Sequence, residues 1–469
     1  KTKQVGFEWE NKAQVWDKVV EEMEEFREAS EQGFSQEKKE EEFGDVLFSL
    51  INYARFENIT PLIFLDLSQN RLVSIDKSIE NMKALEYLYL NNNQLTKIPQ
   101  IISEAENLKS IRLNSNKLNK LPEGLGKLKN LDSLDVHLNQ LPALNAWLGD
   151  LKSLSYLHAS SNPIKQVAPT LWNLPNLKHL DLSDNQLSVR NLNINGASSQ
   201  LETLHLESNA LENFPMEIDN FHQLKYLNLT ANQLSTIPAA LNGLTALETL
   251  VLNWNNLVEI PSPIGDLKAL RNLEMEHNKI TNIDKALSDL ESVIYLNVSN
   301  NLIESLPSSL FELSNLKVLA ISGNKITSAS GNWSNLKALE KLDLARNALK
   351  SAPDNLSQLV NLRALNLREN NLGAFPAQFE NMALLKELDL GENQIEFIPA
   401  EIQALTKLEA LKIDGNLIQK LDPAVMNIAG LRELVLDGNL VKKLPENLGE
   451  LREMRYLSIN GNQLKKLPE

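Results

Sequence analysis

The chain has 469 residues, a net charge of −15, 42% hydrophobic residues and no cysteine. The absence of cysteine excludes a disulfide framework, a thiolate nucleophile and a cysteine-ligated metal. An acidic chain without a basic stripe predicts no nucleic-acid partner, and no apolar run reaches the ~20 residues of a membrane span, so we also predict no membrane partner.

The first 58 residues differ in pattern from the rest and contain 8 basic and 15 acidic residues. We expect two helices here, over residues 11–30 and 36–57. Acidic residues gather on one side of each helix, at Glu21, Glu22 and Glu25 in the first and at Glu42 and Asp45 in the second. Packed antiparallel, the helices would bring four carboxylates together. Like charges that close favour a hard cation, for which Mg2+ is the candidate.

The motifs Glu21-Glu22-x-x-Glu25 and Glu42-x-x-Asp45 follow the word Val5-Gly6-Phe7-Glu8-Trp9. In this order they resemble the catalytic half of MazG-type nucleoside triphosphate pyrophosphohydrolases, which cleave an NTP to NMP and pyrophosphate. The resemblance implies Mg2+ as a cofactor of the segment. It also implies the following roles: metal ligands Glu22, Glu25, Glu42 and Asp45, an assisting Glu21, and nucleotide or phosphate contacts from Asn52 and Arg55.

The segment also departs from that family, whose members continue into a further helix and assemble as dimers. Here the chain runs from residue 57 straight into a repeat at Leu62. Three interpretations stay open. The segment could cap the repeats, with the apolar stripe of the second helix (Phe43, Val46, Leu47, Leu50, Ile51 and Ala54) covering the first strand. It could be an enzyme completed by a homodimer through these helices, or an accidental fusion.

From residue 62 onward, an asparagine recurs with a spacing of 23 residues, interrupted by one step of 24. Its positions are 70, 93, 116, 139, 162, 185, 209, 232, 255, 278, 301, 324, 347, 370, 393, 416, 439 and 462. Each lies in the frame L-x-x-L-x-L-x-x-N-x-L-x-x-[IL]-P-x-x-[IL]-x-x-L. Alternating Leu predicts a short strand with one buried face. A buried Asn can satisfy backbone groups at a tight bend, so eighteen in register predict a ladder.

The frame is that of leucine-rich repeats. It resembles the cytoplasmic type with units of ~23 residues, which implies a cytoplasmic location. We therefore predict an α/β fold: a horseshoe solenoid of 18 repeats over residues 62–469, with a parallel sheet on its concave face and a two-helix segment, 1–58, before it. Pro follows the Asn by six residues in 11 copies and is expected to start the convex segment. The chain stops at Glu469 without a polar terminal face, so we expect further chain or a partner to cover that end.

Two copies depart from the frame. The sixth, over residues 188–200, is longer by one residue and polar, and the twelfth carries Ala329-Ser330-Gly331-Asn332-Trp333. Each is interpreted as a local bulge, with a partner-contact loop as the alternative.

The concave face should present the residues six, four, two and one before each Asn. A protein ligand is expected there, mainly because this architecture builds extended concave surfaces and because Tyr is common on surfaces that bind a partner. The alternative is that Tyr and Asp only tolerate a solvated strand face. The candidate contacts are Tyr87, Tyr89, Tyr156, His158, His179, Asp181, His205, Tyr226, Trp254 and Tyr295. The row His158–Asp181–His205 could hold Zn2+ or respond to pH. Toward the C-terminus the acidic residues Glu387, Asp389, Glu392, Asp414, Glu433 and Asp437 would steer a basic segment.

The predicted function is a protein-binding scaffold. The alternative is a Mg2+-dependent nucleotide pyrophosphohydrolase that the repeats recruit or regulate. The repeats show no catalytic motif, so whether the chain is an enzyme depends on the N-terminal segment.

Overall fold

The computed structural model describes residues 12–35, 38–39, 42–46, 49–50, 53, 62–75, 79, 82–194, 200–260, 262–283, 285–376, 379 and 381–468, except the side chains of residues 240, 285 and 286. The chain forms two compact units. The first comprises Lys1–Leu211 with Asn220–Leu224, and the second Glu212–Asp219 with Lys225–Glu469. No helix among the described residues is both long and apolar enough to cross a bilayer.

The first unit begins with helix α1 (Lys12–Glu31), as predicted, and the chain turns at Gly33 in the left-handed region, φ 72°. The described residues of the second predicted helix, 38–39, 42–46, 49–50 and 53, are helical as well. Trp16 lies 4.7 Å from Tyr53 and Phe26 lies 5.5 Å from Phe43, measured between ring centroids. Because the two contacts run in opposite order along the two segments, the helices pack antiparallel, as expected.

Among the described residues, eighteen short parallel strands follow, one for each predicted repeat. In the first unit they are β1 (Phe64–Asp66), β2 (Tyr87–Tyr89), β3 (Ser110–Arg112), β4 (Ser133–Asp135), β6 (Tyr156–His158), β8 (His179–Asp181) and β9 (Thr203–His205). In the second they are β10 (Tyr226–Asn228), β11 (Thr249–Val251), β12 (Asn272–Glu274), β13 (Tyr295–Asn297), β14 (Val318–Ala320), β15 (Lys341–Asp343), β16 (Ala364–Asn366), β17 (Glu387–Asp389), β18 (Ala410–Lys412), β19 (Glu433–Val435) and β20 (Tyr456–Ser458).

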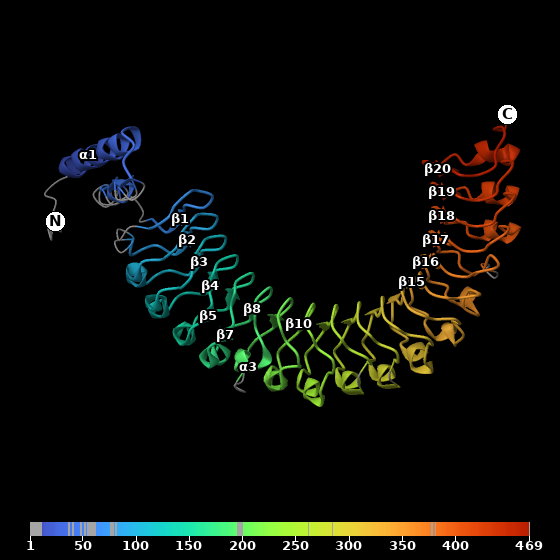
Figure 1. The fold of residues 1–469 in the computed structure, drawn as a ribbon, viewed down its shortest axis with the longest axis horizontal. Helices are drawn as coiled ribbons and strands as arrows, with labels where there is room; N and C mark the ends of the chain where they lie inside the picture. Colours follow the sequence, from blue (N-terminus) through green and yellow to red (C-terminus); the bar gives the residue numbers. More distant parts are fainter. Residues whose placement is uncertain are drawn as a thin grey trace. The chain divides into compact units, whose positions relative to one another are not determined.

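Short helices lie opposite the strands in each unit (Figure 1). All are single-turn: α3 (Val189–Leu192) and the 3-10 helices η2 (Gln100–Glu104), η3 (Glu123–Lys127), η4 (Ala146–Asp150), η5 (Pro169–Asn173), η6 (Met216–Asn220), η7 (Ala239–Gly243), η8 (Ser262–Asp266), η9 (Lys285–Asp289), η10 (Ser308–Glu312), η11 (Trp333–Asn335), η12 (Leu356–Gln358), η13 (Ala400–Ala404), η14 (Pro423–Asn427) and η15 (Glu446–Glu450). A small parallel pair, β5 (Ala143–Leu144) and β7 (Gln166–Val167), also lies outside the main strands.

Neighbouring strands pair in register, so equivalent residues of successive repeats stand side by side. Tyr87 pairs with Ser110, Leu88 with Ile111, and the pattern repeats along each unit. The central strand residue is buried in most strands, as Leu88 and Ile111 are, whereas Leu457 in β20 is 38% exposed. Most of the outer strand residues face solvent, although Val251 and Asn297 are buried. Leucines of the strands and of the short helices therefore form the core between the two layers.

The predicted asparagine ladder is confirmed. Asn116 is representative: its amide Nδ2 donates to the carbonyls of Leu113, 3.0 Å away in its own repeat, and of Leu90, 3.0 Å away in the previous one. Its Oδ1 accepts from the backbone N–H of Leu95 at 2.9 Å. One buried side chain thus joins two repeats by satisfying groups that the bend leaves unpaired.

The step of 24 residues keeps the same bonds. Asn209 donates to the carbonyl of Leu182 at 3.0 Å and accepts from the N–H of Leu187 at 3.0 Å. In the sixth repeat the extra length lies on the opposite side, where α3 replaces a 3-10 helix and Trp172 Nε1 donates to the carbonyl of Leu192 at 2.7 Å.

The residue before each ladder asparagine adopts a left-handed backbone, with φ between 50° and 65° in all eighteen repeats. Four of these positions are glycines, but others hold bulky residues such as Leu138 and Trp254. The sequence frame of the repeat predicted that this residue faces outward, but it did not predict the left-handed backbone conformation. Left-handed backbone is costly for a side chain that cannot hydrogen-bond locally.

The predicted role of proline is confirmed at several described helix caps, whereas Pro353 precedes Asn355, the cap of η12, by two residues. Pro99, Pro122 and Pro307 directly precede η2, η3 and η10 with φ between −67° and −77°. In the sixteenth repeat Asp422 takes this place and its carboxylate accepts from the N–H of Ala424 at 2.9 Å. In the twelfth, Trp333 is fully buried and its Nε1 donates to the carbonyl of Ala329 at 2.8 Å, so its side chain belongs to the core.

The first repeat is less well covered than the others. Its strand residues Leu65 and Leu67 are half-buried, whereas the equivalent Leu88 and Leu90 are fully buried. Leu50, from the stripe predicted to cover this edge, is itself exposed. Leu47, Ile51 and Ala54 of that stripe lie outside the described residues, so the cap interpretation stays a prediction.

Candidate functional site

Two surfaces carry the predicted site residues: a carboxylate cluster between the N-terminal helices and the sheet surface. We define the sheet surface as the side chains six, four, two and one residues before each ladder asparagine.

The two N-terminal helices bring together three of the four carboxylates that were predicted to converge. Carboxylate oxygens of Glu22, Glu42 and Asp45 all lie within 4.8 Å of one another. Glu22 and Glu42 are buried, and among the described residues Glu22 Oε2 has no hydrogen-bond partner. Burial raises the pKa of Glu25, and the nearby charges of Glu22 and Glu42 raise it further. The cluster therefore concentrates negative charge that its surroundings only partly compensate.

Two lysines supply that partial compensation, and the sequence pattern did not reveal their role. Lys18 Nζ lies 2.7 Å from Glu22 Oε1 and 2.8 Å from Glu21 Oε1, while Lys38 pairs with Glu42. Burial would lower the pKa of Lys18, but these hydrogen bonds outweigh it and raise the pKa.

Glu21 thus faces a lysine at the margin of the cluster. The predicted nucleotide contacts, Asn52 and Arg55, and the word Val5-Gly6-Phe7-Glu8-Trp9 lie outside the described residues.

A second cluster lies on the sheet surface of the first unit. Asp135 in β4 and His158 in β6 are register partners, and so are His158 and Asp181 in β8. His137 Nδ1 lies 2.6 Å and His158 Nδ1 3.6 Å from Asp135 Oδ1, and His158 Nε2 lies 3.2 Å from Asp181 Oδ2. The rings of His137 and His158 stack with centroids 4.2 Å apart.

Charges within this cluster stabilise one another. Burial would lower the pKa of His158, but the hydrogen bond to Asp181 and the charge of Asp135 raise it. Burial opposes ionisation of Asp181 as well, yet hydrogen bonds from His158 and Ser183 lower its pKa to about 2.

The predicted row His158–Asp181–His205 is not the group that converges. Within the part of the chain that is described, the histidine-containing group whose ligand atoms all lie within 4.8 Å is Asp135, His137 and His158. His205 turns along its own strand, with Nδ1 3.3 Å from Glu207 Oε1. His179 Nδ1 contacts Thr203 Oγ1 at 2.8 Å. The alternation of strand residues contained the signal for Asp135 and His137, since both point outward beside His158.

A recess of about 410 Å3 adjoins this cluster. It is lined by Asn91, Arg112, Asn114, Ser133, Asp135 and Tyr156. The Arg112 guanidinium lies 4.2 Å from the centroid of the Tyr89 ring, a cation–π contact. Burial and the charges of Asp135 and Asp181 raise the pKa of Tyr156. Here the sheet surface offers one cation among aromatic and amide groups.

The aromatic residues of the second unit lie on the sheet surface as predicted. Tyr226 and Tyr295 stand three strands apart in the same register. Between their repeats Trp254, whose backbone is left-handed, is 58% exposed and stacks on His277 with ring centroids 3.7 Å apart.

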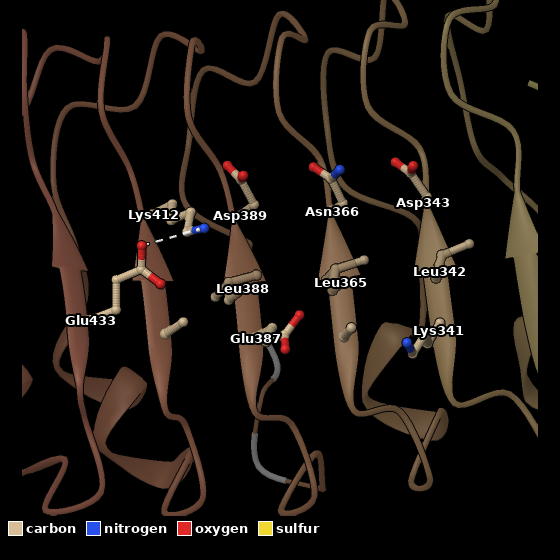
Figure 2. Close-up of a pocket in the computed structure, with 12 residues that line it drawn as sticks. Lys341, Leu342, Asp343, Leu365, Asn366, Glu387, Leu388, Asp389, Lys412 and Glu433 are labelled. Atoms are coloured by element: carbon tan, nitrogen blue, oxygen red, sulfur yellow. Dashed lines mark ion pairs between the residues drawn. The ribbon is translucent and has the colours of Figure 1, made fainter. Parts of the chain in front are cut away.

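Farther along the second unit, a recess of about 350 Å3 crosses β15 to β19 (Figure 2). Asp343, Asn366 and Asp389 stand side by side along it, and Lys412 pairs with Glu433 at 3.4 Å. Burial raises the pKa of both Asp343 and Asp389.

Basic residues already pair with much of the predicted acidic surface. Arg368 donates to both oxygens of Asp414, at 2.9 and 2.6 Å, and lies 3.6 Å from Asp389 and 3.5 Å from Glu392. Asp437 accepts from Ser458 Oγ at 2.7 Å. These pairs weaken the expectation that this region steers a basic partner.

Comparison with known families supports the repeat fold along most of the chain. A model described as "Leucine-rich repeat region" matches residues 345–466. Further leucine-rich repeat models match residues 62–103, 106–164, 176–196, 199–257, 292–349 and 314–372. A stretch of 77 residues that includes the N-terminal segment resembles the nucleoside triphosphate pyrophosphohydrolase/pyrophosphatase MazG of Thermotoga maritima, with 39% identity. That stretch is 16% of this chain and spans 29% of the enzyme.

Among solved structures, a leucine-rich repeat protein of Leptospira interrogans matches with a TM-score of 0.66 and 28% identity over 86% of this chain and 90% of that one. The ectodomain of the Arabidopsis thaliana receptor kinase GASSHO1/SCHENGEN3, in complex with CASPARIAN STRIP INTEGRITY FACTOR 2, matches with a TM-score of 0.61 and 27% identity. This match covers 90% of this chain and 55% of that one. The Arabidopsis receptor kinase HAESA, in complex with the peptide hormone IDA and the co-receptor SERK1, matches with a TM-score of 0.61 and 25% identity. This match covers 88% of this chain and 76% of that one. With its repeated frame, paired strands and asparagine ladder, the chain belongs to the leucine-rich repeat proteins.

Proposed function

We propose that the chain is a protein-binding scaffold whose partner, an extended peptide segment, lies along the sheet surface near Trp254. The observation that carries this proposal is the exposure of Trp254 in a fixed orientation. The side chain is 58% exposed, yet it stacks on His277 and its backbone is left-handed, φ 56°. An immobilised, exposed Trp loses little conformational entropy on binding, which is the property of an interface hot spot.

The surroundings of Trp254 favour an extended ligand. Tyr226 and Tyr295 flank it at equivalent strand positions, roughly 14 Å apart at a strand spacing of ~4.8 Å. A short peptide spans that distance and could place side chains on all three rings. Structural neighbours of 25% identity or more include receptors in complex with a peptide hormone or a named factor, which supports a peptide ligand for this chain. We further propose a cytoplasmic setting, in keeping with a chain that lacks cysteine.

The test compares two exposed aromatic residues against one captured partner. The partner is isolated with the full chain as bait, and its affinity is then measured by calorimetry. Trp254→Ala should weaken binding by about 30-fold, since a hot spot contributes ~2 kcal/mol. The control is Phe397→Ala, because Phe397 is equally exposed but lies outside the sheet surface; it should change affinity less than about twofold. If Phe397→Ala weakened binding and Trp254→Ala did not, the proposal would be contradicted and the partner would lie on the surface that carries Phe397.

We propose a second function for the N-terminal segment, Mg2+-dependent hydrolysis of nucleoside triphosphates to NMP and pyrophosphate, because Glu22, Glu42 and Asp45 converge. The residues fit the ion: the donors are carboxylate oxygens, and Glu22 Oε2 is buried with no hydrogen-bond partner in the described part of the chain. Glu22, Glu25, Glu42 and Asp45 would hold Mg2+, which when bound polarises phosphate oxygens. The carboxylates bind and orient the ion, while Lys18 and Lys38 offset their repulsion when it is absent.

Two helices do not complete a bundle core, and we propose that a second copy completes it. Trp16, Val20 and Met23 lie at helical spacing on one face of α1 and are all exposed. Such a stripe normally faces a partner helix. Val20→Lys should then abolish both dimerisation and turnover, whereas the control Glu28→Lys, at an exposed residue of the same helix, should leave both unchanged.

Turnover itself is tested by pyrophosphate release from mixed NTPs with Mg2+. Glu42→Gln should abolish release and Glu24→Gln should not, because Glu24 is exposed outside the cluster. Release that is equal in parent and Glu42→Gln, or no release from the parent, contradicts this second function.

A further inference from the structure

The strands β4, β6 and β8 place two histidines between two aspartates on the sheet surface. Asp135, His158 and Asp181 occupy equivalent positions on these three neighbouring strands, and His137 follows Asp135 by two residues. Ligand atoms of Asp135, His137 and His158 all lie within 4.8 Å of one another, and all three residues are half-buried. We propose that Asp135, His137 and His158 form a binding site for Zn2+, with His158 bound through Nδ1.

The distances fit a tetrahedral ion after a small adjustment. Bonds of 2.0–2.2 Å to nitrogen and oxygen place neighbouring ligand atoms about 3.4 Å apart in a tetrahedral zinc site. Asp135 Oδ1 already lies 3.6 Å from His158 Nδ1. Asp135 Oδ1 lies 2.6 Å from His137 Nδ1. The distance between these two atoms would therefore increase by less than about 1 Å when the ion replaces the proton that they share. Two imidazoles and one carboxylate suit Zn2+ and disfavour Mg2+.

Asp181 supplies the orientation that a zinc-bound histidine needs. Asp181 Oδ2 lies 3.2 Å and Ser160 Oγ 2.6 Å from His158 Nε2. Both oxygens can accept from an N–H at Nε2, which leaves the lone pair of Nδ1 facing Asp135. The Asp181 carboxylate is itself held by the backbone N–H of Ser183 at 2.9 Å and by its hydroxyl at 2.6 Å. A carboxylate that fixes the tautomer of a histidine ligand is the usual partner of protein zinc sites.

Three protein ligands leave a fourth coordination position open to solvent or to a partner group. Asp135 also lines the recess that contains Arg112 and Tyr156. A partner carboxylate entering there would meet both the ion and the Arg112 guanidinium. This site lies in the first unit and does not depend on the peptide site proposed at Trp254.

The test is a calorimetric titration of the full chain with ZnCl2, run on a Glu42→Gln background so that zinc at the N-terminal carboxylates does not contribute. We expect one ion per chain. His137→Ala and His158→Ala should each abolish this binding, whereas His179→Ala, a neighbouring exposed histidine, should leave it unchanged. Asp181→Asn should keep one ion and weaken affinity about 10-fold, as loss of an outer carboxylate does.

Circular dichroism of each variant confirms that the fold is intact, and the visible spectrum of the Co2+-loaded protein reports four-coordinate geometry. The proposal is overturned if His158→Ala binds zinc as the parent does, if His179→Ala abolishes binding equally, or if Asp181→Asn changes nothing. Unaltered binding in Asp181→Asn would leave only adventitious histidine contacts.

Discussion

The asparagine ladder can be tested at Asn301 in the second unit. The side chain is 5% exposed, and its Oδ1 accepts from the N–H of Ile280 at 3.0 Å. Its Nδ2 donates to the carbonyls of Met275 and Val298, each at 3.0 Å. Asn301→Ala removes all of these bonds.

The expected loss follows from what each backbone group keeps. The carbonyl of Met275 still accepts from Asn278, and that of Val298 from Asn324. The N–H of Ile280 keeps no other described acceptor, so it becomes a buried, unsatisfied donor. Such a group costs ~1–3 kcal/mol, and with the weakened carbonyl bonds we expect the free energy of unfolding to fall by about 2–3 kcal/mol.

The assay is urea unfolding followed by circular dichroism, comparing midpoints because repeat arrays depart from two-state behaviour. The control is Asn315→Ala, which removes one exposed bond, from Asn315 Nδ2 to the carbonyl of Glu291, and should cost less than ~0.5 kcal/mol. An Asn301→Ala midpoint equal to that of the control would refute the assignment of the ladder as the link between repeats.

Three further changes test other contacts. Gly331→Ala should destabilise the chain by ~1–3 kcal/mol in thermal melts, because the added Cβ would overlap the Phe311 ring; an unchanged melting temperature would show that the ring has room to move. Asp422→Ala should cost about 1 kcal/mol in the same melts through loss of the cap on η14, and a loss near zero would contradict that role. Arg368→Met should cost ~1 kcal/mol at pH 7, since the pair with Asp414 is partly exposed. Burial would raise the pKa of Asp414, but the hydrogen bonds and charge of Arg368 outweigh it and hold this pKa below its ordinary value. The contribution of the pair is therefore complete above the unfolded pKa of about 3.9 and is lost as pH falls through the lower pKa of the folded state. Urea midpoints of parent and variant should therefore converge at low pH, and a constant gap would contradict this assignment.

The sequence period was sufficient to predict the strands, their register and the ladder, because each depends on equivalent residues meeting in successive repeats. The left-handed residue before each asparagine was not predictable, since bulky residues such as Leu138 and Trp254 disfavour it locally and adopt it only under the constraint of the ladder. Here the hydrogen bonds of the repeat override local preference.

The candidate sites were predictable in part. Helical spacing and antiparallel packing predicted that Glu22, Glu25, Glu42 and Asp45 converge, and the oxygens of Glu22, Glu42 and Asp45 do lie together. On the sheet, register predicted that His158, Asp181 and His205 stand in a row, but register does not set side-chain rotamers. His205 turns toward Glu207 on its own strand, and this leaves His158 to converge with residues on the other side.

The ladder also bears on how such a chain can change its length during evolution. The side-chain bonds described for Asn209 reach only its own repeat or the previous one, and Asn209 keeps the full set although the previous repeat, the sixth, is one residue longer. An insertion in the return segment therefore leaves the junction between repeats intact. Duplication or loss of a whole repeat recreates the same junction with whichever neighbour remains. Selection can thus alter the number of repeats, and the reach of the binding surface, without redesigning the core.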